Sequence, residues 1–210
     1  MRPIARFGLV LSVFAGLAPL PASARVYLNP EFGMRVLVPD AFTLCLDTPA
    51  EMNNFALGPF RPRDHGPDIM LDAKSKHDCR ADDGRRWVSI YAGYNVIPEE
   101  STLEGLRKSA CDLNEENAAG ECTAGPSGLG LKGIKTLTVQ RRLKNGWIDI
   151  AVVAEMGTTP HDQEPEGVSY KFRLHTNVAH RDEDLAAFRK ILRGARLWRT
   201  TTPVEGRDPA

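Results

Sequence analysis

The residues best suited to chemistry are two histidines set among acids and a cysteine in a polar stretch, residues 64–79. Imidazole and carboxylate groups bind zinc and other divalent ions, usually at short spacings such as two histidines one helical turn apart. Here His65 and His77 stand twelve residues apart in loop-like sequence, and Cys79 is expected to be oxidised. We therefore predict no metal site and keep a metal-assisted hydrolase as an alternative hypothesis. Its further ligands would be Asp64, Asp72 and Asp78.

No other pattern in the sequence predicts catalysis. A Gly-x-Ser-x-Gly nucleophile elbow is absent from the sequence. The glycine-rich run GPSGLGLKG at 125–133 lacks the Gly-Lys-Ser/Thr ending of a phosphate-binding loop, so we interpret it as a flexible loop. The remaining histidines, His161, His175 and His180, are of a kind common at surfaces, sheet edges and helix starts. We predict neither an enzyme nor a cofactor.

Two long polar loops, at about 47–67 and 157–167, are better suited to binding another protein. The first carries aromatic and arginine side chains, which dominate the energetics of protein interfaces. The second has an acidic tip that would speed association with a basic surface. The predicted partner-binding residues are Phe55, Phe60, Arg61, Arg63, Asp162, Glu164 and Glu166.

The leading hypothesis is therefore a non-catalytic binding protein that acts through a protein–protein interface. One specific form is an inhibitor or immunity protein against a toxin or enzyme that acts in the periplasm. The alternatives are an envelope accessory or chaperone-like protein and a carrier of a small ligand.

The structural element that organises the chain is a predicted antiparallel hairpin over 134–156. Asn145-Gly146 predicts a two-residue type I′ turn, because this pair tolerates positive φ at both central positions. Counting outward from that turn places Leu143 opposite Ile148 and Arg142 opposite Asp149. One face of the hairpin is then apolar apart from Arg141, which we expect to extend to the sheet margin. The pattern predicts a sheet with one strongly covered side.

Alternating apolar residues predict further strands at 32–38, 42–46, 68–73, 87–96, 170–176 and 195–199. Helical spacing predicts one helix over 102–113, with Ser101 and Glu104 as a capping box, and another that Asp182 caps and Gly194 ends. The expected fold class is α+β, an antiparallel sheet of about six to seven strands with two helices packed on it.

The first 24 residues resemble a cleaved export signal. Arg2 and Arg6 precede an apolar run at 7–20, and Ala22-Ser23-Ala24 forms a small-x-small cleavage site. We predict cleavage after Ala24, a single domain over 25–200, a flexible tail at 201–210, and a periplasmic location. No cysteine stands at the cleavage site and no later run would span a bilayer, so we expect no membrane anchor.

Four cysteines in an exported chain predict disulfides. Of the three possible pairings, we expect Cys45 with Cys79 and Cys111 with Cys122. Each bond would stabilise the fold by about 2–4 kcal/mol.

The charge balance argues against nucleic acid or an anionic membrane as a partner. The chain has 27 basic and 27 acidic residues, and removal of the predicted signal leaves 25 basic residues against 27 acidic ones.

The opening FGMRVLVPDAFTLCL, the long hairpin and the closing YKFRLHT…LAAFRKILRGARLW together resemble the Mog1/PsbP-like α/β/α layout in order and hydrophobic pattern. The resemblance spans most of the mature chain, but the four cysteines are not part of it. It implies a protein that binds other proteins in an accessory or chaperone-like role rather than an enzyme.

Overall fold

The computed structural model describes residues 24–30, 32–46, 65–75, 77–79, 84–94, 102–112, 115–157 and 167–199. The predicted signal peptide, apart from Ala24, and the predicted tail lie outside these residues, so their processing and flexibility stay predictions. Within the described part of the chain, no helix combines the length and the apolar character needed to cross a bilayer.

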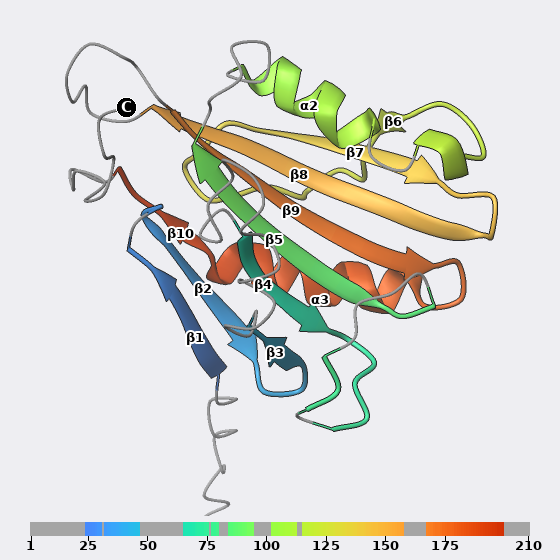
Figure 1. Ribbon diagram of the computed structural model, residues 1–210, viewed down its shortest axis with the longest axis horizontal. Coiled ribbons are helices and arrows are strands. Elements are labelled where there is room, and N and C mark those ends of the chain that lie inside the picture. Colours follow the sequence, from blue (N-terminus) through green and yellow to red (C-terminus); the bar gives the residue numbers. More distant parts are fainter. Residues whose placement is uncertain are drawn as a thin grey trace, which may run out of the picture.

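A seven-stranded antiparallel sheet runs through the molecule (Figure 1). In spatial order its strands are β3 (Thr43–Cys45), β4 (His65–Met70), β5 (Trp87–Tyr94), β9 (Gly167–Asn177), β8 (Trp147–Gly157), β7 (Thr136–Arg142) and β6 (Thr123–Ala124). The long strands β8 and β9 occupy the middle and pair along eleven residues each.

One face of this sheet is covered by α3 (Arg181–Gly194) and a second, three-stranded sheet. The small sheet consists of β1 (Ala24–Asn29), β2 (Met34–Pro39) and β10 (Arg196–Leu197), with β2 in the centre. Alternation along β2 directs Met34, Val36 and Val38 inward. There they share a continuous core with the apolar side chains of α3 and of β5, β8 and β9.

The other face is covered over β7 and β8 by α2 (Leu103–Asp112). Leu106 and Ala110 of α2 pack against Val139 of β7 and Val153 of β8 in a separate small core. A short 3₁₀ helix, Glu115–Asn117, follows α2 before the chain reaches β6. The sheet is thus covered on one face by α3 and the small sheet and on the other, over β7 and β8, by α2, so the expectation of a single covered side is wrong.

The register of the hairpin explains this correction. The turn has three residues, 144–146, because the N–H of Leu143 donates to the carbonyl of Trp147 and the N–H of Gly146 donates to that of Leu143. Gly146 takes up the left-handed conformation, with φ of 84°. The pairing is therefore one residue away from the predicted one: Arg141 lies opposite Asp149 and Arg142 opposite Ile148.

This shift exchanges the faces of β7. Leu137 and Val139 lie on the α2 side, whereas their predicted companions Ile148 and Ile150 face α3. Arg141 is also on the α2 side and is 8% exposed, so it is buried rather than extended to the sheet margin as we predicted.

Both helices start as predicted to within a residue or two, but other side chains fix their ends. The hydroxyl of Thr102 accepts from the N–H of Gly105 and caps α2, while Glu104 pairs with Arg107 instead of reaching back. At α3, the side chain of Asn177 accepts from the N–H of His180, so Asp182 is not the cap. The predicted capping box and the predicted Asp182 cap are both wrong.

Disulfides join Cys45 to Cys79 and Cys111 to Cys122, as predicted. The first attaches the edge strand β3 to the connection between β4 and β5. The second attaches the end of α2 to the residue just before β6. The predicted α+β fold class, with two helices on an antiparallel sheet and two disulfides, is confirmed.

The turn geometry predicts that Gly146→Ala lowers the free energy of unfolding by about 1 kcal/mol, because a Cβ is strained at positive φ. Gly120→Ala is the matched control, since a Cβ there meets no atom within 4 Å and its φ is ordinary. Urea unfolding of both variants measures the difference. Equal effects at the two positions would contradict the left-handed conformation at Gly146.

Candidate functional site

The sequence-predicted partner-binding residues lie outside the described part of the chain: Phe55, Phe60, Arg61, Arg63, Asp162, Glu164 and Glu166. The strands that flank their loops are described. His65, where the first loop enters β4, pairs with Tyr91 near the end of β5. Gly157 and Gly167, which flank the second loop, pair with each other. Because Tyr94 at the end of β5 pairs with Val168, these strand ends meet at one end of the large sheet, at the upper left in Figure 1.

Further along the α2 side of the sheet, an imidazole lies between two indoles. His175 of β9 stacks on Trp147 with ring centroids 4.7 Å apart and on Trp87 with centroids 5.1 Å apart. Trp87 lies directly opposite His175 in the ladder between β5 and β9. Trp147 begins β8, the strand on the other side of β9. We call Trp87, His175 and Trp147 the aromatic stack.

Asp149 joins this stack to an arginine. One carboxylate oxygen lies 2.7 Å from Nδ1 of His175, and the other accepts from Nη2 of Arg173 at 2.5 Å. Burial by itself raises the pKa of Asp149, but the hydrogen bond from His175 and the charge and hydrogen bond of Arg173 outweigh it, so the pKa lies below its usual value. The guanidinium carbon of Arg173 also lies 5.2 Å from the ring centroid of Trp87.

The structure corrects our interpretation of His175 as a surface or sheet-edge histidine. It lies in a central strand and is 0% exposed. Alternation along β9 correctly separates His175 and Arg173 from Phe172 and Leu174, which enter the core. The stack was missed because it requires Trp87 and Trp147, which are distant from His175 in sequence, and the placement of β5 and β8 on either side of β9.

An aspartate–histidine pair is also part of hydrolytic triads, where the imidazole accepts a proton from a nucleophile. His175 is poorly placed for that chemistry, because indoles cover both faces of its ring and no part of its side chain reaches solvent. A general base has to come within hydrogen-bond distance of the proton that it removes. In this arrangement Asp149 holds both His175 and Arg173 in place.

A patch of polar and aromatic side chains continues from the stack toward the loop end of the sheet. It consists of Ser89 and Tyr91 of β5 with Lys171 and Arg173 of β9, all partly buried, and we call it the β5–β9 patch. Lys171 lies opposite Tyr91, and its ammonium group is 5.8 Å from the centroid of that ring. Cations stacked on aromatic rings are held at lower conformational freedom than free surface lysines or arginines.

Asp72, Asp78 and Cys79 of the alternative metal site have other partners, whereas Asp64 lies outside the described part of the chain. The guanidinium of Arg85 binds Asp72 at 2.9 Å and binds both carboxylate oxygens of Asp78. The hydrogen bonds from Arg85 hold the pKa of Asp78 below its usual value. Cys79 is bonded to Cys45, and His77 is exposed. No group of three potential metal ligands occurs among the residues that the structure describes.

Comparison with known proteins gives a resemblance in fold. No protein-family model matches the chain, and no curated protein matches it. The solution structure of cyanobacterial PsbP (CyanoP) from Synechocystis sp. PCC 6803 is similar, with 16% identity and a TM-score of 0.48, over 87% of this chain and 96% of that one. The expected resemblance to the PsbP-like layout is confirmed, and it concerns the arrangement of strands and helices alone.

Replacement of the carboxylate that holds the stack tests its structural importance. We expect Asp149→Asn to lower the free energy of unfolding by about 3 kcal/mol, because it removes the charge that the buried His175 and the partly buried Arg173 share. The control is Glu104→Gln, which breaks an exposed pair with Arg107 and should lower the free energy of unfolding far less. Denaturant unfolding at pH 7 compares the two variants. Similar decreases in the free energy of unfolding for both would show that the hydrogen bonds of Asp149 contribute little to stability.

The lowered pKa of Asp149 also sets a pH dependence. A carboxyl group whose pKa is lower in the folded than in the unfolded state stabilises the folded protein. This contribution is complete at pH values above the unfolded pKa, about 3.9, and it is lost as the pH falls through the folded pKa. The stability difference between the parent and Asp149→Asn should therefore shrink as the pH falls below about 4. Unfolding curves between pH 2 and 5 measure it, and a difference that grows toward acid pH has the wrong sign for this assignment.

Proposed function

We propose that this chain is a non-catalytic binding protein of the bacterial periplasm that acts through a protein–protein interface at the loop end of its large sheet. The observation that supports this proposal most is the topology. The pairs His65–Tyr91, Tyr94–Val168 and Gly157–Gly167 place the flanks of the aromatic, arginine-bearing loop and of the acidic loop at the same end. Residues that are far apart in sequence are thereby available to one partner.

The β5–β9 patch supplies a second part of this interface. Arg173 is held by Asp149 and by the face of Trp87, and Lys171 lies over Tyr91. Arginine and tyrosine are frequent hot-spot residues. Side chains that are already fixed before binding lose less conformational entropy when a partner arrives, which favours affinity. The patch lies beside the strand ends that flank the two loops, so the proposed interface extends over it.

The two disulfides support the proposed compartment. Disulfides persist in oxidising environments such as the periplasm and are rare in the cytosol. Both bonds are formed here. These features fit a chain that is exported and folds after export.

Among binding proteins, we propose an inhibitor or immunity protein against a toxin or enzyme that acts in the periplasm. An inhibitor needs groups that enter or cover an active site, and loops carried by a rigid sheet meet this requirement. The acidic residues Asp162, Glu164 and Glu166 would be attracted to a basic active site. An accessory protein of the envelope would use the same surface without silencing its partner, and an activity assay of the bound partner separates these two roles.

Site-specific photo-crosslinking tests the placement of the interface. A photoreactive amino acid at Phe60, in the first loop, should capture a single partner in the producing cells. The control position is Val178, which is 71% exposed and lies at the opposite end of the sheet, just after β9. Capture from Val178 and none from Phe60 would place the interface elsewhere.

Affinity measurements with the captured partner test individual residues. We expect Arg61→Ala and Glu164→Ala each to weaken binding by about tenfold or more, as is typical of hot-spot positions. Arg142→Ala is the matched control, because Arg142 is exposed at the far end of β7. Unchanged affinity in both loop variants would contradict the assignment of Arg61 and Glu164 as partner-binding residues.

A further inference from the structure

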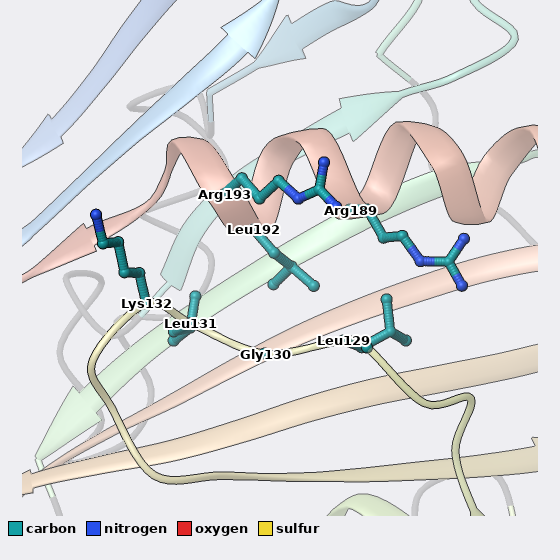
Figure 2. Close-up of a pocket in the computed structure, with 8 residues that line it drawn as sticks. Leu129, Gly130, Leu131, Lys132, Arg189, Leu192 and Arg193 are labelled. Carbon is teal, nitrogen blue, oxygen red and sulfur yellow. The ribbon is translucent and has the colours of Figure 1, made fainter.

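A pocket of about 400 Å³ lies between the glycine-rich loop that precedes β7 and the C-terminal half of α3. This volume is in the range of small-molecule sites. Figure 2 shows Leu192 of α3 pointing toward Leu129 and Leu131 of the loop. Leu131 and Leu192 are buried members of the main core, so the apolar floor of the pocket is fixed.

Three cationic side chains also line this pocket: Lys132 from the loop and Arg189 and Arg193 from α3. In Figure 2, Arg189 and Lys132 lie at its two ends. Among the described residues, no carboxylate lies within 4.0 Å of any of the three. The acids of α3 are in its first turn, at the other end of the helix: Asp182, Glu183 and Asp184. Since the whole chain has a net charge of zero, the positive charge is a local feature of the pocket.

The loop adds backbone donors. Among the described residues, the N–H groups of Leu129, Gly130 and Leu131 donate to no protein acceptor. A Cβ on Gly130 would lie 3.0 Å from the hydroxyl of Thr136, so glycine lets the loop approach β7 closely. Free backbone N–H groups of glycine-rich loops commonly bind anions. The loop that the sequence suggested to be merely flexible thus forms one wall of a cationic pocket.

We propose that this pocket binds a small amphipathic anion, with its apolar body on Leu129, Leu131 and Leu192. The anionic group, a phosphate or carboxylate, is held by Arg189 and Arg193, which are one helical turn apart on α3, whereas Lys132 lies at the other end of the pocket. Arginine forks match the geometry of both anions. The pocket lies on the α3 side of the large sheet, whereas the β5–β9 patch lies on the α2 side, so this site is independent of the proposed protein interface.

Titration with decyl phosphate below its micellar concentration tests the site in the oxidised protein. We expect saturable binding by calorimetry, with amide chemical-shift changes concentrated at Gly130 and Leu131. Inorganic phosphate alone and decanol alone should each bind at least about tenfold more weakly, because each lacks one half of the recognised chemistry. If inorganic phosphate binds as tightly as decyl phosphate, the site takes free phosphate and the amphipathic assignment is overturned.

Charge-removing variants test the cationic side chains. Arg189→Gln and Arg193→Gln should each weaken decyl phosphate binding about tenfold. Lys190→Gln is the matched control, since Lys190 is exposed on the same helix but does not line the pocket. Unfolding curves verify that all three variants remain folded. Equal losses in all three, shift changes confined to other surfaces, or the absence of saturation would each overturn the proposal.

Discussion

The three-residue turn at 144–146 determines which side chains of the central hairpin share a face. With Gly146 in the left-handed conformation, Arg141 pairs with Asp149 and every other pair follows. The small core beneath α2 depends on this register, because it brings Val139 to the same side as Ala151 and Val153. The aromatic stack lies on the same face, because Trp147 and Asp149 of β8 point to that side and β8 pairs with β9. A shift by one residue would move Arg141 to the main-core face and take Val139 away from α2.

Much of the fold follows from local sequence patterns. Alternation in β2 and β9 identifies Val36 and Phe172 as core residues, and helical spacing identifies α2 and α3. The export signal and the even cysteine count predict disulfides but leave three pairings open, and the structure selects Cys45 with Cys79 and Cys111 with Cys122. The turn length does not follow from local patterns, because Asn-Gly suits both two-residue and three-residue hairpin loops. The caps are equally ambiguous, since Ser101 and Thr102 are adjacent residues with the same capping chemistry.

The functional surfaces are harder to predict because they combine residues from separate strands. Trp87 and Trp147 meet around His175 only after β5, β9 and β8 have been placed side by side. The pocket likewise requires the loop at 128–132 to lie against α3. Each half of the pocket looks ordinary in sequence. One half is a glycine-rich loop, and the other is a pair of arginines on a helix. Their chemistry becomes visible only when long-range packing brings the halves together.

Both edges of the large sheet end in very short strands, three residues in β3 and two in β6. Each edge is also fastened covalently, through Cys45 within β3 and Cys122 next to β6. Open strand edges are templates for intermolecular pairing and aggregation, and short edges reduce that risk. The disulfides therefore protect solubility as well as stability. A copy of this protein that stayed reduced would present two loosened edges to its neighbours, so its self-association depends on the redox state of its surroundings.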